Sequence, residues 1–182
     1  MSYLENTLNQ FDSYNYNIEL HMVHPKDHEL FYSAIPGRTI VIADNSRESR
    51  YNISDLEQTF KVGYGEVRNA YGSMFNLKIS EPNGVTLLEK IVESAASLGI
   101  DNHLQAKYFL ILEFIGRTST GAAKRHPTKF IYSITFRSLQ TQIDAGGATY
   151  NIDAVDTSYS GFNYLEQVVR SQITLEAATV GE

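Results

Sequence analysis

The stretch 71–99 constrains the fold of this chain most strongly, because it joins a strand pattern, a turn and a helix pattern in one run, YGSMFNLKISEPNGVTLLEKIVESAASLG. Apolar and polar residues alternate over Tyr71–Ser80, which predicts a half-buried strand. The apolar face of this strand comprises Phe75, Leu77 and Ile79. Glu81-Pro82 is expected to stop the strand, because proline cannot donate a hydrogen bond to a ladder, and Asn83-Gly84 supplies the turn.

An amphipathic helix is predicted over about 86–98. Thr86 and Glu89 have the spacing of a capping box at its start, and Gly99 is suited to be the left-handed residue that closes it. Apolar residues recur every three or four positions and predict one buried stripe: Leu88, Ile91, Val92 and Ala95. We expect this stripe to be core, so that an aspartate at its first position abolishes soluble folding.

Apolar runs predict further strands along the chain. They cover Tyr14–Val23, Arg38–Ala43, Tyr108–Ile115, Lys129–Leu139, Thr149–Ala154 and Gln172–Ala178. Tyr108–Ile115 is apolar on both faces, so it is either central or covered by another layer. Periodicity does not decide between strand and helix for Tyr51–Phe60, and Ser158–Gln167 is compatible with a short helix. The predicted fold class is mainly β: an antiparallel β-barrel or sandwich with one principal flanking helix.

The domain organisation is predicted to be simple. Residues 1–14 are polar and are interpreted as an N-terminal arm, and residues 15–178 form one β domain, long enough to bury a core. Residues 179–182 resemble the start of a further segment, because Thr179 and Glu182 repeat the capping spacing. This ending is typical of a longer polypeptide or of a terminus that docks on a partner.

Composition excludes several classes of protein. The formal net charge is −6 and the basic residues are scattered, which disfavours a nucleic-acid-binding protein. The chain has no cysteine, which removes disulfides and thiolate zinc sites. The N-terminus has no signal-peptide pattern, and no apolar run reaches the roughly 20 residues of a membrane helix. We therefore expect synthesis in a host cytoplasm and no membrane insertion by this chain.

Candidates for chemistry are weak. Three histidines lie within eight positions, at His21, His24 and His28. Two carboxylate pairs are near in sequence, Asp153 with Asp156 and Glu89 with Glu93. We interpret the histidines as solvated rather than metal-binding, and the carboxylates as surface and loop residues. No nucleophile, phosphate-loop or dinucleotide motif is present. The sequence predicts a protein that is not an enzyme and has no catalytic, cofactor or metal residues.

The segment Arg117–Pro127 is a polar loop that joins two long apolar strands into a hairpin. Its tip, Thr118–His126, is small and locally basic through Lys124 and Arg125. Two interpretations stay open: a binding element for a neighbouring subunit with an acidic surface, or a solvated hairpin tip.

The order of these elements resembles virion structural proteins of contractile-tailed bacteriophages, particularly baseplate hub proteins with tail-tube-like domains. The resemblance covers about residues 38–140. It rests on a strand with an E-P-x-G-x-x-L turn, the helix that follows and the next apolar strand with its terminal glycine. The residues that carry it are Glu81, Pro82, Gly84, Leu87, Gly99, Ile100, Asn102 and Gly116.

The resemblance implies a tube-like β-barrel whose copies close into a trimer- or hexamer-like ring around the tail axis. Its expected partners are the tube, spike and wedge proteins of a virion baseplate, with DNA only as passing cargo. A baseplate wedge or tube-initiator protein is an alternative of the same class. A carbohydrate-binding β-sandwich with stacking tyrosines is an alternative of another class. A lytic hub enzyme is disfavoured, because no carboxylate dyad is apparent.

Overall fold

The computed structural model describes residues 11–27, 39–62, 71–120 and 122–156. Over these ranges the chain is mainly β, with one α-helix, α1 (Leu87–Ser97), and two short 3-10 turns, η2 (Pro25–Asp27) and η5 (His103–Gln105). The prediction of a mainly β fold with one principal helix over about 86–98 is confirmed. No helix in the described ranges has the length and apolar character needed to cross a membrane.

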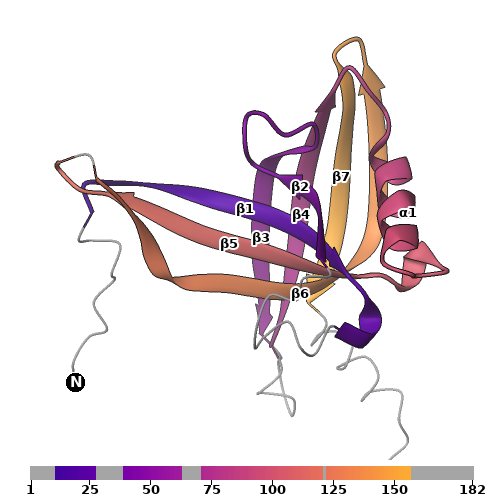
Figure 1. Ribbon diagram of the computed structural model, residues 1–182, viewed down its shortest axis with the longest axis horizontal. Coiled ribbons are helices and arrows are strands. Elements are labelled where there is room, and N and C mark those ends of the chain that lie inside the picture. The colour runs from indigo at the N-terminus through magenta and orange to yellow at the C-terminus, as the bar shows by residue number, and fades with distance from the viewer. Residues whose placement is uncertain (1–10, 28–38, 63–70, 121, 157–182) are drawn as a thin grey trace, which may run out of the picture.

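Seven strands pair in a closed circuit, in the order β1-β2-β3-β4-β7-β6-β5 and back to β1 (Figure 1). The strands are β1 (Ser13–Val23), β2 (Thr39–Asp44), β3 (Asn52–Val62), β4 (Tyr71–Pro82), β5 (Lys107–Arg117), β6 (Ala123–Asp144) and β7 (Gly147–Asp156). All ladders are antiparallel except that between β2 and β3, which is a single parallel bridge from Asp44 to Asn52. The circuit therefore closes at one narrow seam.

The predicted strands agree with the structure, with shifted ends. The segment Tyr51–Phe60, which the sequence left undecided, lies almost entirely in β3. β4 ends at Pro82, within the Glu-Pro pair that was expected to stop it and two residues beyond the predicted end at Ser80, and Asn83 turns the chain with a positive φ of 58°. The expected loop Arg117–Pro127 is shorter, because β6 already begins at Ala123. The predictions for 1–10, 158–167, 172–178 and 179–182 lie outside the described residues.

The described residues form a main apolar core and a smaller apolar cluster around Phe109. The alternation predicted for β4 is confirmed, since Phe75, Leu77 and Ile79 are at most 2% exposed. β5 is buried on both faces, as its continuous apolar run predicted, with Phe109 on one side and Leu110 on the other. Such burial is the main stabilising term, at about 25 cal/mol per Å² of apolar surface removed from water.

The buried face of α1 differs from the predicted stripe. Its buried residues are Leu87, Ile91, Ser94 and Ala95, and the first, second and fourth belong to the core cluster. Leu88 and Val92 are instead 56% and 44% exposed. The predicted stripe was therefore wrong at these two positions, because two adjacent leucines fit the same periodicity and the choice between them depends on where the helix lies on the sheet. Because Leu88 is exposed, the structure gives no reason for Leu88→Asp to abolish folding.

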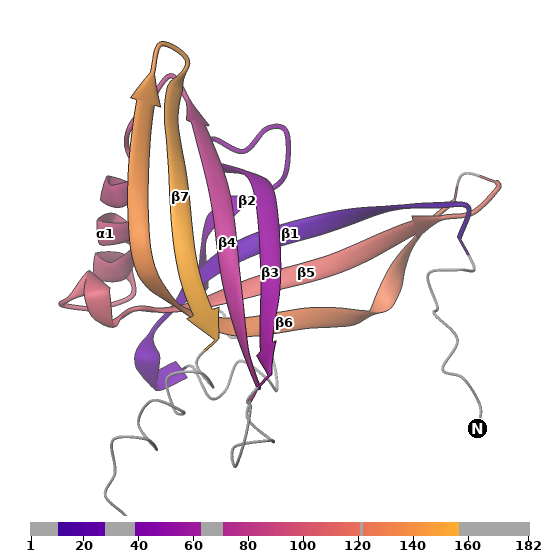
Figure 2. The ribbon, with the colours of Figure 1, turned by 180° about the vertical axis from the view of Figure 1, so that it is seen from behind.

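The molecule has a long projection on one side. The outer halves of β1, β5 and β6 run away from the other strands, while α1 lies at the opposite end of the long axis (Figures 1 and 2). We define the projection as Ser13–Asn17 of β1, Glu113–Arg117 of β5 and Ala123–Phe130 of β6. In these ranges β5 pairs with both neighbours. Its last residue, Arg117, lies opposite Ser13 of β1 on one side and opposite Ala123 of β6 on the other.

Candidate functional site

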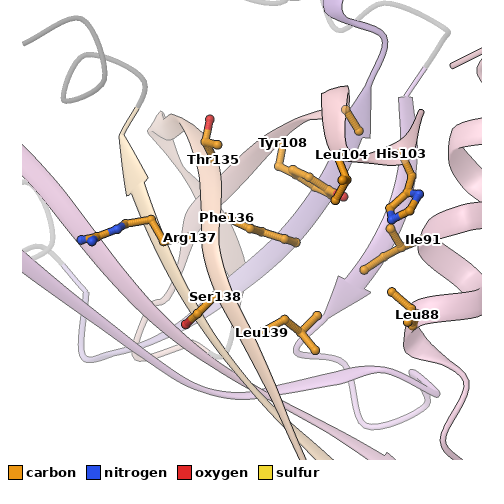
Figure 3. Close-up of a pocket in the computed structure, with 11 residues that line it drawn as sticks. Leu88, Ile91, His103, Leu104, Tyr108, Thr135, Phe136, Arg137, Ser138 and Leu139 are labelled. Atoms are coloured by element: carbon orange, nitrogen blue, oxygen red, sulfur yellow. The ribbon is translucent and has the colours of Figure 1, made fainter. Parts of the chain in front are cut away.

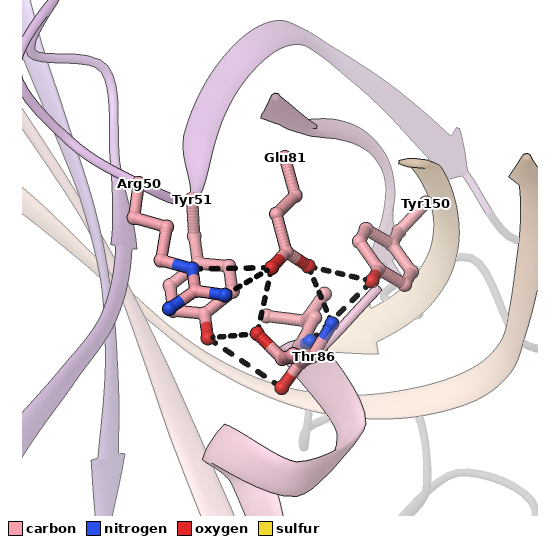
Figure 4. A network of polar contacts seen from close by, with 6 residues as sticks. Arg50, Tyr51, Glu81, Thr86 and Tyr150 are labelled. Carbon is pink, nitrogen blue, oxygen red and sulfur yellow. Dashed lines mark hydrogen bonds and ion pairs between the residues drawn. The ribbon is translucent and has the colours of Figure 1, made fainter. Parts of the chain in front are cut away.

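Glu81 is the centre of a buried polar junction at the end of β4 (Figure 4). Its side chain is fully buried, and both carboxylate oxygens accept hydrogen bonds. Oε2 accepts from the backbone N–H of Thr86 at 2.7 Å and from the hydroxyl of Tyr150 at 2.8 Å. Oε1 accepts from the Thr86 hydroxyl at 2.6 Å and from Arg50, whose Nε lies 3.2 Å away. The junction thus joins β4, the start of α1, β7 and the loop before β3.

The predicted capping box is absent. The Thr86 side chain makes no cap bond within α1; its hydroxyl faces Glu81 instead and contacts the Tyr51 hydroxyl at 2.8 Å. Glu81 takes over part of the capping function from outside the helix, because its carboxylate binds a backbone N–H immediately before the helix starts. The negative charge also lies at the helix end that favours it.

The electrostatics of the junction follow from these bonds. Burial by itself raises the pKa of Glu81, but the hydrogen bonds from Thr86, Tyr150 and Arg50 outweigh it and leave the pKa below its ordinary value. Burial and the hydrogen bond to Glu81 raise the pKa of Tyr150 to about 12. The pair is therefore a fixed carboxylate and a fixed neutral phenol near neutral pH, with no proton to exchange.

Two glycines leave room for the junction. A Cβ at Gly84 would lie 2.3 Å from Oε1 of Glu81, and one at Gly147 would lie 2.2 Å from its backbone oxygen. Gly147 also has a φ of 130°, which side-chain-bearing residues rarely adopt. Leu87 donates its N–H to the Tyr150 hydroxyl at 3.3 Å and is fully buried. The E-P-x-G-x-x-L pattern is thus explained as a folding device, with every polar group of Glu81 engaged inside the protein.

The projection carries a second candidate surface, made of aromatic rings. Phe114 stacks edge-on against Tyr14, with ring centroids 5.9 Å apart, and against Phe130 at 6.2 Å. Tyr14 and Tyr16 are more than half exposed, and Phe130 is 39% exposed. We call Tyr14, Tyr16, Phe114 and Phe130 the aromatic face. It continues the side of β1 that is buried at Ile18, so the apolar face of the core runs out onto the projection.

A groove beside α1 is a third candidate (Figure 3). It has a volume of about 230 Å³ and runs between the helix, η5 and β6. Its walls are mainly apolar and include Leu88, Ile91, Leu104, Phe136 and Leu139. Phe136 and Leu139 point toward the helix, whereas Arg137 points away from it (Figure 3). Leu104 is 80% exposed at the rim. The groove has the character of a contact surface for an apolar partner.

A cleft of about 490 Å³ lies at the seam of the circuit, where the projection leaves the body. Asn45 lies on one wall of the cleft and binds the backbone of β1. Its N–H donates to the Ile18 oxygen at 3.1 Å, its Oδ1 accepts from the Ile18 N–H, and its Nδ2 donates to the Tyr16 oxygen. Polar and apolar residues of β1, β3 and β5 alternate around the cleft, which has no cluster of titratable side chains.

The histidines and carboxylates singled out from the sequence do not form a common site in the described residues. His21 is buried rather than solvated and binds Glu19 at 2.8 Å, while His24 accepts a hydrogen bond from the backbone of Lys26. His28 lies outside the described residues. Nowhere in the described ranges do three possible metal ligands converge.

The two carboxylate pairs are placed differently. Asp153 lies in β7 rather than in a loop, and it accepts a 2.6 Å hydrogen bond from the Ser138 hydroxyl. Asp156 is the last residue of the same strand. Glu89 and Glu93 are exposed on α1, as expected. Sequence reasoning missed Arg50 and Tyr150 as partners of Glu81, and Tyr51 as a partner of Thr86, since they come from two distant segments.

Two solved structures show a distant similarity to this chain. No family model matches the chain, and no curated protein matches it. A solved structure of a lidless PdpA–VgrG complex is similar with a TM-score of 0.37 and 13% identity, over 84% of this chain and 21% of the matched chain. A lidded Francisella PdpA–VgrG complex is similar with a TM-score of 0.37 and 11% identity, over 84% and 17%. This chain spans about a fifth of either matched chain.

Proposed function

We propose that this protein is a non-enzymatic structural component of a phage-tail baseplate, and that it forms part of the central hub ring between the tail tube and the spike. The observation that carries the assembly role is the aromatic face, which extends the core surface onto a projection where Tyr14 and Tyr16 are more than half exposed among the described residues. Contiguous exposed apolar surface of this kind is typical of protein interfaces.

The hub identity rests on the sequence resemblance over about 38–140. In support, the residues that carry the resemblance perform defined structural tasks: Glu81 ties the turn together, Gly84 leaves space for it and Gly99 ends α1 with a φ of 75°. Each of these tasks concerns folding rather than chemistry, as expected for a virion structural protein.

The partners follow from the same proposal. Copies of the chain form a trimer- or hexamer-like ring, the tube and wedge proteins contact it, and the spike lies below it. DNA is passing cargo only, and the net charge of −6 disfavours its retention. The protein is then localised to the virion tail after synthesis in the host cytoplasm.

Electron microscopy together with light scattering tests this proposal. The purified protein is expected to form annular particles whose mass is a small multiple of 20.5 kDa. Antibody against the chain is expected to label the baseplate end of contractile tails on their axis. Labelling at the periphery would favour the wedge alternative instead. A monomer that binds sugars on a glycan array would overturn the proposal in favour of a carbohydrate-binding module, for which exposed Tyr14 and Tyr16 would be the stacking platforms.

A further inference from the structure

Within the part of the chain that the structure describes, two grouped apolar surfaces are exposed. The first is the aromatic face, where Tyr14 and Tyr16 are 54% and 55% exposed. The second is the outer shoulder of α1 with the adjacent groove rim. We call the second surface the α1 shoulder and define it by Val85, Leu88, Val92 and Leu104, whose exposure ranges from 44% to 80%. Single exposed apolar residues are ordinary, but two grouped surfaces call for a partner.

The two surfaces cannot cover each other within one molecule. The projection and α1 lie at opposite ends of the long axis in both views (Figures 1 and 2). Along the projection β5 pairs with β1 without interruption, and with β6 on both sides of a register shift between Glu113 and Ile115. A second copy, by contrast, presents both surfaces in the same form. A contact between unlike surfaces of two copies is heterologous, and such contacts close into rings when the rotation allows.

The charges of the two ends are complementary. Residues 112–130, which span the outer parts of β5 and β6, contain four basic residues and one acidic residue. Residues 85–104, which span α1 and η5, contain three acidic residues and one basic residue. The end of the molecule with the projection is thus locally basic in a chain of net charge −6, although Asp12 adds one negative charge there.

The charged side chains and the aromatic rings of these two surfaces contribute differently to the contact. Strand alternation places Lys129 on the face of the sheet opposite its neighbour Phe130, and Arg117 is exposed near the tip. Glu89 and Glu93 are exposed beside Leu88 and Val92 on α1. These charges therefore surround the contact and steer the approach of two copies, within a Debye length of about 8–10 Å. The aromatic rings supply the buried contact itself.

We propose that the aromatic face of one copy docks on the α1 shoulder of a second copy, so that copies join head to tail. This inference rests on the proposed assembly function and assigns its partner: another copy of the same chain, bound through unlike ends. It also favours one of the two interpretations of the basic hairpin tip, namely that it binds an acidic surface of a neighbouring subunit.

Mixing two complementary variants tests the proposal. The double variant Tyr14→Ser with Tyr16→Ser removes the two exposed tyrosines of the aromatic face and keeps the α1 shoulder. The double variant Leu88→Ser with Val92→Ser removes the two helix residues of the α1 shoulder and keeps the aromatic face. Light scattering is expected to show each variant alone as a 20.5 kDa monomer. An equimolar mixture is expected to give a complex of two copies and no larger species, because each complex has one intact contact and two defective ends.

The matched control is Phe60→Ser. Phe60 is 64% exposed on β3 and belongs to neither surface, so this variant is expected to assemble like the unmodified protein. Raising the salt concentration from about 0.1 M to about 1 M shortens the Debye length from about 10 Å to about 3 Å. The higher salt is expected to slow association without abolishing it.

Cross-linking provides a readout that does not depend on the folding of double variants. The chain contains no cysteine, so single cysteines can be introduced without competition. A short bismaleimide is expected to join a Tyr14→Cys copy to a Leu88→Cys copy, whereas neither alone gives a cross-linked dimer. Phe60→Cys mixed with Tyr14→Cys is the negative control.

Three outcomes overturn the head-to-tail contact. They are a mixture that stays monomeric, a Tyr14→Cys protein that cross-links to itself, and annular particles that persist in both double variants. The last outcome leaves the proposed ring function standing, because it shows a ring built through another surface. An unmodified protein that is monomeric at every concentration overturns the ring function and the contact together.

Discussion

The hydroxyl of Tyr150 donates a 2.8 Å hydrogen bond to Oε2 of Glu81, and the two residues are 2% and 0% exposed. Sixty-nine positions separate them in the sequence. The bond fixes the end of β4 against β7 at the point where the chain turns into α1. Several consequences of this bond can be measured.

Substitution of Glu81 is expected to destabilise the fold strongly. Glu81→Ala leaves Tyr150 and the Thr86 N–H without their partner in a buried place, at a cost of about 3–5 kcal/mol in the free energy of unfolding. Glu81→Gln keeps the shape but loses charge-assisted bonds, at about 1–3 kcal/mol. Urea unfolding measures both. The surface substitution Glu93→Ala is the control, and an Ala variant no less stable than this control would contradict the junction.

Stability is expected to fall in acid. Because the folded-state pKa of Glu81 is below the ordinary value of about 4.3, its contribution is present above that value and is lost as the pH falls through the folded pKa. Glu19 shifts the same way, since bonds from His21 and Asn17 outweigh its burial. Unfolding curves between about pH 5 and pH 3 measure the slope, and Glu81→Gln should flatten it. An unchanged slope would exclude Glu81 as its source.

Alkali is expected to act through Tyr150. Its folded-state pKa of about 12 lies above its ordinary value of 10.0. The stability that this phenol contributes is therefore present below pH 10 and is lost as the pH rises through the folded value. Absorbance of the phenolate during a pH titration follows this group. Because burial also raises the pKa of Tyr108 to about 12, the assignment compares the unmodified protein with Tyr150→Phe. A titration that is identical in both would contradict it.

The two turn glycines that have positive φ are expected to respond differently to alanine. At Gly147 the new Cβ meets the backbone of Glu81, so the cost exceeds the backbone strain of about 1–3 kcal/mol. At Gly99 nothing lies within 4 Å of the new Cβ, so only the left-handed conformation costs about 1–2 kcal/mol. Thermal unfolding of both variants measures the difference. Equal losses would show that the close approach at Gly147 is unimportant.

The helix offers a direct comparison of neighbouring residues. Leu87→Ala is expected to lose about 2–5 kcal/mol, because Leu87 is fully buried in the core. Leu88→Ala should change stability by no more than about 0.5 kcal/mol. Urea unfolding measures both. A larger loss of stability for Leu88→Ala than for Leu87→Ala would support the buried stripe that the periodicity predicted.

Ser94 should tolerate, and gain from, the loss of its hydroxyl. It is 3% exposed, and its Oγ has no hydrogen-bond partner in the described part of the chain. Ser94→Ala removes this buried polar group and favours the helix, so a stabilisation of about 1 kcal/mol is expected. Exposed Ser97 bonds to the Glu93 oxygen, and Ser97→Ala is the matched control. A destabilised Ser94 variant would indicate a partner.

The sequence predicted most of the elements, because the local patterns are strong. Alternation defined the buried face of β4, and the continuous apolar run of β5 predicted its burial on two sides. Gly99 was recognised as the end of α1 for a local reason, the positive φ that the position requires. The Glu-Pro turn was recognised as a boundary, although its partners were not.

The remaining features were not local. Thr86 fits a capping box by spacing, yet its hydroxyl binds Glu81, which approaches only because β4 and the helix start meet in space. His21 was interpreted as solvated, yet it is buried.

The sequence by itself determined most of the described strands, where α1 lies and where it ends, because these depend on neighbouring residues. Only the tertiary structure decided which leucine of the pair at 87 and 88 is buried, which distant groups complete the Glu81 junction and how far β1, β5 and β6 extend beyond the core. These features depend on the position of α1 on the sheet and on the register between strands, and residues far apart in the chain set both.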